Sequence, residues 1–141
     1  MIASVLMVCT GNVCRSPMAE ALLRARRPGL TAASAGVAAL VGEPPPEPAV
    51  ELMADRGLDI SGHRGRQLDA GLVRGFDLLL VMEQGQADWI TRSFPFSRGR
   101  VQRLGRWRDR DVADPFRRPR EAYEAALADI EACLQDWLER I

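Results

Sequence analysis

The sequence predicts an α/β fold in which helices flank a single-domain, open, parallel, four-stranded sheet. Two observations support this prediction. Short apolar runs alternate along the chain with segments of helical periodicity, and this alternation is typical of parallel strands joined by helical crossovers. A chain of 141 residues, 47% of them hydrophobic, also suits one compact domain, 1–141, with a core of its own.

The predicted elements follow one another in a regular order. Strands are expected at the apolar runs 2–8, 30–34, 76–82 and 101–104. Helices are expected at 17–26, 48–56, 84–91 and 121–140. Pro17 stands near the first position of the first helix, where the missing N–H of proline costs no hydrogen bond.

The last helix has the clearest pattern. Its apolar residues recur at steps of three and four, which places them on one face: Tyr123, Ala126, Leu127, Ile130, Cys133, Leu134, Trp137, Leu138 and Ile141. Cys133 belongs to this face. We therefore expect it to lie in the core and to have no redox role.

Composition argues against several kinds of protein. The chain has no apolar run of about 18 residues and no signal-peptide pattern, so we expect no membrane insertion and a cytoplasmic location. The three cysteines, two of them in one loop, do not make a disulfide framework. The single histidine leaves too few ligands for an ordinary structural zinc site, and no metal or cofactor is expected.

Charge is balanced overall but unevenly distributed. The net charge is zero, yet nine arginines lie between Arg98 and Arg120 against three aspartates, Asp109, Asp111 and Asp114. This basic stretch is either a solvated face or a docking surface for an acidic phosphoprotein segment. The zero net charge and the lack of a stacking-aromatic motif argue against a nucleic-acid partner.

The most informative segment is 9–16, which reads Cys-Thr-Gly-Asn-Val-Cys-Arg-Ser. It joins the first predicted strand to the first predicted helix, so the free N–H groups and the positive dipole end of the helix can hold a phosphate there. Arg15 can grip two phosphate oxygens, and the same positive field favours the thiolate form of Cys9. A thiolate beside a held phosphate predicts attack on phosphorus.

Two further points concern this loop. It is not a nucleotide-binding loop of the G-x-x-x-x-G-K-[ST] type, because the chain contains no lysine. In open parallel sheets, ligands bind beyond the carboxyl ends of the strands where the strand order reverses, which is the position expected for 9–16. Cys14 shares the loop with Cys9 and could close a disulfide on an oxidised Cys9.

The loop resembles the signature of the low-molecular-weight protein tyrosine phosphatases, C-x5-R-[ST] followed by a small apolar helix start, over residues 9–20. Further segments match the order and approximate spacing of that family, so the resemblance covers nearly the whole chain: 34–36, 41–44, 62–68, 76–82 and 113–116. Segments 34–42 and 114–121 are similar to the bacterial subgroup associated with exopolysaccharide or capsule export.

The resemblance implies a role for each matching residue. Cys9 would be the nucleophile that forms a phosphocysteine, Arg15 would bind the phosphate, and Asp114 would act as general acid and then as general base. The substrate would contact the loop residues Thr10, Gly11, Asn12, Val13, Cys14 and Ser16. A polar network of Asn12, Ser16, Ser34 and His63 would keep the loop rigid.

The resemblance also bears on the substrate. Leu40 and Phe116 would be the apolar walls of a deep slot for phosphotyrosine; many eukaryotic members have an aromatic residue and a tyrosine there, which leaves the peptide preference open. The bacterial subgroup implies a membrane tyrosine autokinase as the phosphoprotein partner. The oligomeric state stays open.

Two other functions compete with this one. A thiol-dependent arsenate reductase on the same fold would need additional resolving cysteines near Met82, and none is present. A phosphotyrosine-binding module without turnover would be expected to lack Cys9, Arg15 or Asp114, and all three are present.

Overall fold

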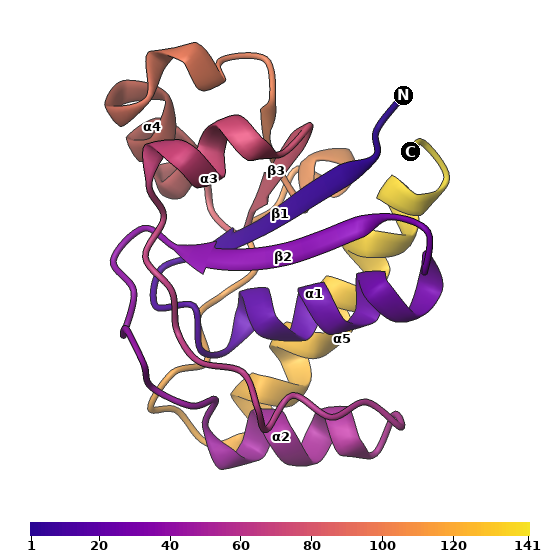
Figure 1. Cartoon of the computed structure of the whole chain (residues 1–141). Coiled ribbons are helices and arrows are strands. Elements are labelled where there is room, and N and C mark those ends of the chain that lie inside the picture. The colour runs from indigo at the N-terminus through magenta and orange to yellow at the C-terminus, as the bar shows by residue number, and fades with distance from the viewer.

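The computed structural model describes all residues from 1 to 141 and contains one four-stranded parallel sheet with the strand order β2-β1-β3-β4. The strands are β1 (Ser4–Cys9), β2 (Thr31–Gly36), β3 (Leu78–Val81) and β4 (Val101–Arg103). Each lies within two residues of its predicted run. The predicted fold class is thereby confirmed (Figure 1).

Strand β1 lies in the middle of the sheet and is buried on both faces. Val5 and Met7 belong to one core cluster, whereas Leu6 and Val8 belong to the other, and none of the four is exposed. Alternate side chains of a strand point to opposite faces, so a strand covered on both sides needs a continuous apolar run. The sequence of β1 meets this requirement.

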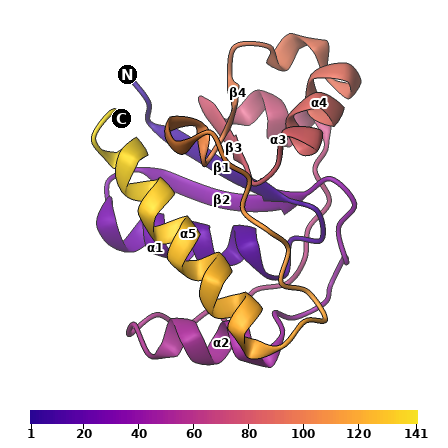
Figure 2. The ribbon, with the colours of Figure 1, turned by 180° about the vertical axis from the view of Figure 1, so that it is seen from behind.

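The helices form a layer on each side of the sheet (Figures 1 and 2). On one side, α1 (Arg15–Arg26) and α5 (Arg120–Leu138) pack against each other, and α2 (Glu47–Ala54) packs on α5. On the other side lie α3 (Ala70–Gly75) and α4 (Gln84–Ser93). Cys133 is fully buried in α5, as expected from the periodicity. No helix is long and apolar enough to cross a membrane.

Helix α3 and two short 3-10 turns, Pro95–Ser97 and Arg106–Arg108, were not predicted. Helix α3 has only six residues and includes Gly71 and Gly75, so it carries no helical periodicity to detect. Its start is stabilised instead by the Asp69 carboxylate, which accepts a hydrogen bond from the Leu72 N–H at 2.8 Å.

The topology determines where a ligand can approach the sheet. The chain passes from β1 to β2 on one side and then to β3 on the other side of β1, so the strand order reverses at β1. Beyond the carboxyl end of β1 the connections diverge and leave a crevice. The loop 10–14, between β1 and α1, occupies that crevice.

Candidate active site

The loop between β1 and α1 curls around the sulfur of Cys9. The Asn12 N–H donates to Cys9 Sγ at 3.2 Å, and the Ser16 hydroxyl lies 2.9 Å from the same sulfur. Asn12 takes the left-handed conformation, with φ of 59°, which asparagine tolerates better than most residues. Both contacts place hydrogen-bond donors where negative charge on sulfur would be stabilised.

The segment after β2 supports this loop from outside. The N–H groups of Ala38 and Leu40 donate to the carbonyls of Thr10 and Gly11 at 3.0 and 2.9 Å. Gly36 allows this close approach, because a Cβ at that position would lie 2.4 Å from the Thr10 carbonyl oxygen. A larger residue at Gly36 would therefore push the loop away from β2.

A buried polar network joins three of the four predicted supporting residues. The Asn12 amide donates to Ser16 Oγ at 2.7 Å, and the Asn12 carbonyl oxygen lies 2.7 Å from His63 Nε2. The Arg66 N–H donates to Asn12 Oδ1 at 2.9 Å. Segment 63–66 thus supports loop 9–16, the predicted phosphate loop, through Asn12.

The side chain of Ser34 does not join this network, contrary to expectation. Its hydroxyl donates to Glu20 Oε1 at 2.6 Å, and its carbonyl accepts from the Arg66 guanidinium at 3.1 and 3.3 Å. Ser34 lies before the end of β2, where its neighbours are α1 and Arg66, so its hydroxyl finds a partner on α1.

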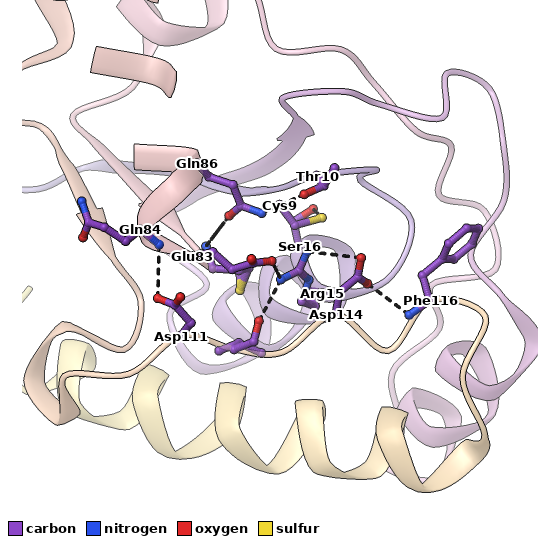
Figure 3. Close-up of polar contacts among 12 residues, drawn as sticks. Cys9, Thr10, Arg15, Ser16, Glu83, Gln84, Gln86, Asp111, Asp114 and Phe116 are labelled. Carbon is purple, nitrogen blue, oxygen red and sulfur yellow. Dashed lines mark hydrogen bonds and ion pairs between the residues drawn. The ribbon is translucent and has the colours of Figure 1, made fainter. Parts of the chain in front are cut away.

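Arg15, the first residue of α1, is 1% exposed and is held from two other elements. Its Nη1 donates to the Glu83 carboxylate and, at 2.8 Å, to the Val112 carbonyl. Its Nη2 lies 3.7 Å from Asp114 Oδ2 (Figure 3). The guanidinium therefore has a fixed orientation at the loop, with the Asp114 carboxylate beside it.

Glu83 and Gln86, which the sequence reasoning did not single out, connect α4 to the site. The two form a capping box at the start of α4. Gln86 is 5% exposed, accepts from the N–H groups of Met82 and Glu83, and donates to Thr10 Oγ1 at 3.0 Å. The start of α4 thus contacts the phosphate loop at both Thr10 and Arg15 (Figure 3).

A pocket of about 140 Å³ opens above the loop. Its base consists of loop residues, and its upper wall is largely apolar; the lining residues are Cys9, Thr10, Gly11, Val13, Cys14, Arg15, Ala38, Leu40, Asp114 and Phe116. Leu40 and Phe116, the predicted walls, both line this pocket. The pocket combines an anion site with a rim that suits an aromatic ring.

Asp114 lies on the connection that leads to α5, and its side chain is 48% exposed. Its Oδ1 accepts from the Phe116 N–H at 3.1 Å, which ties the carboxylate to the residue that forms the wall. Asp114, Cys9 and Arg15 line one pocket, although they are far apart in the sequence. A carboxyl group here can exchange protons with a group bound above Cys9.

Cys14 is 3% exposed and lies against the hydroxyl of Tyr123, the only tyrosine in the chain. Burial, with the neighbouring Cys9 and Asp114, raises the pKa of the Cys14 thiol to about 12. Burial also raises the pKa of Tyr123 to about 12, with Cys14 as the next cause. All three cysteines are free, and the redox role of Cys14 stays a prediction.

Four of the nine arginines in the arginine-rich stretch form ion pairs with acidic residues, three of them with acids elsewhere in the chain. Arg108 and Arg110 pair with Asp136 and Asp129 of α5, and Arg120 pairs with Glu51. Arg103 pairs within the stretch, with Asp109 and Asp111. These pairs were hidden because the local count ignored acids outside the stretch. No group of three or more potential metal ligands is present.

Comparison with known proteins agrees with this geometry. The model of the low molecular weight phosphotyrosine protein phosphatase family matches residues 4–141. The chain is 48% identical to the probable low molecular weight protein-tyrosine-phosphatase EpsP of Ralstonia nicotianae, with 100% of this chain and 97% of the relative covered.

Solved structures agree as well. Vibrio vulnificus Wzb in complex with benzylphosphonate superposes with a TM-score of 0.96 at 35% identity, with 100% of both chains covered. The tyrosine phosphatase Wzb of Escherichia coli K30, in complex with sulphate, superposes with a TM-score of 0.94 at 40% identity and 99% coverage of both chains. The YwlE arginine phosphatase of Geobacillus stearothermophilus also superposes, with a TM-score of 0.91 at 35% identity, and 97% and 91% of the two chains are covered.

Proposed function

The chain belongs to the low molecular weight phosphotyrosine protein phosphatases and is thus a cysteine-dependent protein tyrosine phosphatase; we propose that Cys9 carries its catalysis through a phosphocysteine intermediate. One observation carries this proposal. The Cys9 sulfur lies inside a loop that points the Asn12 N–H and the Ser16 hydroxyl at it, and the buried Arg15 guanidinium lines the same pocket.

The proposed reaction has two steps. In the first, the Cys9 thiolate attacks phosphorus, an S–P bond forms, the P–O bond to the aryl group breaks, and protonated Asp114 gives its proton to the departing oxygen. In the second, the Asp114 carboxylate takes a proton from water, the oxygen of that water attacks phosphorus, and the S–P bond breaks to release phosphate and the Cys9 thiolate. Arg15 and the loop N–H groups bind the phosphoryl oxygens throughout.

The rim of the pocket supports an aryl phosphate as substrate. Val13, Leu40 and Phe116 supply apolar surface on which a phenyl ring can pack, and a tyrosyl group carries its phosphate far enough to reach the base between these walls. The rim holds a single carboxylate, Asp114, which is already committed to Arg15 and the Phe116 N–H. A guanidinium-borne phosphate would find no further carboxylate within this pocket.

The physiological partner follows from the subgroup resemblance of segments 34–42 and 114–121. We propose a membrane tyrosine autokinase of an exopolysaccharide export system as the phosphoprotein, with the phosphatase acting on it from the cytoplasm. The proposal needs no contact with nucleic acid and no insertion into the membrane.

The nucleophile is tested with Cys9→Ser. This variant should lose turnover of phosphotyrosine peptides almost completely but still bind phosphate or vanadate, because the loop and Arg15 remain. Arg15→Lys, the matched change at the second catalytic position, should also be severely impaired. The ammonium group of lysine cannot make the two parallel hydrogen bonds that the planar guanidinium offers to a phosphate. A Cys9→Ser variant that keeps more than a few per cent of the wild-type rate would refute the covalent mechanism.

The same Cys9→Ser protein serves as a substrate trap in cell lysate. Recovery of a phosphorylated tyrosine kinase supports the export role, whereas recovery of small phosphometabolites alone refutes it. Parallel assays on phosphotyrosine and phosphoarginine peptides test the argument from the apolar rim. Faster hydrolysis of phosphoarginine would overturn it.

A further inference from the structure

A second groove continues from the active-site pocket. It has a volume of about 360 Å³ and shares three lining residues, Val13, Leu40 and Phe116, with that pocket. Its remaining lining residues are Glu43, Pro44 and Arg117. Because the two cavities meet at the same apolar wall, a peptide whose phosphotyrosine occupies the first can place a neighbouring residue at the second.

Arg117 occupies this groove at a conformational cost. It is the third residue of a tight turn that the Arg118 N–H closes on the Pro115 carbonyl at 2.9 Å. Its φ is 62°, in the left-handed region that favours glycine. The other non-glycine residues with positive φ are Asn12 and Asp109, which are types that tolerate this region. An arginine here points to a use for its side chain.

The turn lies close to the active site. The backbone amide of Arg117 lies against the hydroxyl of Tyr123, and that hydroxyl also lies against the Cys14 thiol of the phosphate loop. Tyr123 is 3% exposed, so it cannot move away without opening the core. The backbone of Arg117 therefore lies beside a buried residue that neighbours the loop of Cys9.

The guanidinium of Arg117 has no acidic partner. It lies 5.3 Å from the centre of the Phe116 ring, and it makes no ion pair, in contrast to Arg103, Arg108, Arg110 and Arg120 of the same stretch. Glu43 lines the same groove without pairing with it. Arg117 is thus an exposed cation, stacked on the apolar wall, with its N–H donors free.

We propose that this groove is a second substrate subsite, in which Arg117 binds the carboxylate of an acidic residue that flanks the phosphotyrosine. The proposal rests on the proposed function and specifies its substrate as an acidic phosphotyrosine segment. Pro44 and Phe116 cover the stem of the acidic side chain. Glu43 repels a second carboxylate and so limits the subsite to one acidic residue.

The test is a ratio of kcat/KM values for matched peptides. Each peptide carries one phosphotyrosine and one Glu or one Gln. That residue stands at one of the four positions within two residues of the phosphotyrosine. Hydrolysis of 4-nitrophenyl phosphate is the internal standard. For the wild-type enzyme, one position should give a Glu-to-Gln preference of about threefold to tenfold through KM, and the preference should shrink with added salt.

Arg117→Gly should bring this ratio to about one, with an unchanged or higher Tm because glycine relieves the turn. Arg117→Gln repeats the test without changing the backbone freedom. Arg118→Gln is the matched control, since Arg118 also has no ion pair but does not line the groove, and it should keep the preference. Glu43→Gln should raise the rate on peptides with two acidic residues.

The outcomes separate the subsite from the proposed function. If the wild-type enzyme hydrolyses all peptides well but shows no preference, or if Arg117→Gly and Arg117→Gln keep the preference, the subsite is refuted and the phosphatase assignment stands. An equal loss in Arg118→Gln would also refute it, because the effect would then be general charge attraction. If no phosphotyrosine peptide is hydrolysed, the proposed function fails first.

Discussion

The loop that holds Cys9 and the connection that carries Asp114 meet at Arg15, but they are built differently. In the first, residues 12–16 are all at most 3% exposed. Their polar groups bond to one another, to segment 63–66 and, from Arg15, to Glu83 and Val112. In the second, Ala113, Asp114, Arg117 and Arg118 are exposed, and Asp114 has only the contacts to Arg15 and Phe116.

This difference shows how the site divides its work. The phosphate is the same in every substrate, so the part that binds it can be rigid and buried. In the proposed mechanism, the proton donor Asp114 faces the leaving group, which belongs to the variable part of the substrate. It therefore lies on an exposed loop, next to the wall and groove that contact that part.

Among the substitutions that test this comparison, Asp114→Asn should lower kcat the most. Loss of a positioned proton donor should lower kcat by roughly 10² to 10⁴ for a phenolic leaving group. The loss should shrink as the leaving group becomes more acidic, since a better leaving group needs less protonation. The measurement is kcat across a series of aryl phosphates.

Asp109→Asn is the matched control for this series, because Asp109 is a fully exposed aspartate on the same connection that pairs only with Arg103. It should follow the wild-type line. Parallel slopes for Asp114→Asn and the wild type would place the proton donor elsewhere.

Glu83→Gln tests the rigid side of the comparison and should have the next largest effect. The amide keeps the shape but loses the charge that orients Arg15 Nη1, so kcat should fall by roughly 10- to 100-fold. Phosphate should bind more tightly, because a neighbouring negative charge is gone. A purely structural role would instead weaken phosphate binding and lower kcat together, which inhibition constants for phosphate would reveal.

Oxidation of Cys9 should cause a loss of activity that is reversible, unlike the losses caused by the substitutions above. Peroxide oxidises the Cys9 thiolate to a sulfenic acid, which Cys14 can attack with loss of water to form a disulfide that dithiothreitol reduces. Because burial raises the pKa of Cys14 to about 12, closure should be slow at neutral pH and faster in alkali. Wild-type activity should recover after dithiothreitol more fully than that of Cys14→Ser. Equal recovery would argue against a protective disulfide.

The smallest effect concerns the contact between Cys14 and Tyr123, which joins the two regions. Both groups have pKa values raised to about 12, from ordinary values of 9.0 and 10.0, so the folded state retains protons that the unfolded state loses. Their contribution to stability is complete below pH 9 and disappears as the pH rises from 9 to 12. The free energy of unfolding in urea should fall less steeply over pH 10–12 in Tyr123→Phe than in the wild type. An identical slope would contradict this account.

Residue patterns alone marked segment 9–16 as a phosphate loop, whereas only the family resemblance connected Asp114 and Phe116 with it. Segment 9–16 and its flanking elements lie close together in the chain, so strand periodicity, helix start and residue types could be interpreted jointly. Glu83 and Gln86 were missed because they lie 68 and 76 residues from their partners Arg15 and Thr10, and no local pattern marks such a contact. Ser34 was misplaced because the orientation of its hydroxyl depends on Glu20 and Arg66.

The two central strands β1 and β3 were predictable because they are apolar runs buried on both faces, and α5 because its apolar residues recur regularly. The pairing of the arginine-rich stretch was not, since Asp129 and Asp136 come from α5. The groove beside Arg117 arises from three separate segments and has no sequence signature.

The contact between Arg15 and Glu83 affects the rate at which inorganic phosphate leaves the active site. An unneutralised, buried guanidinium would hold the inorganic phosphate that is left after each reaction and would delay the next turnover. One carboxylate bonded to the Arg15 guanidinium and a second 3.7 Å away offset part of its positive charge. We therefore expect weak product inhibition and rapid release, at the expense of some affinity for the incoming phosphoryl group.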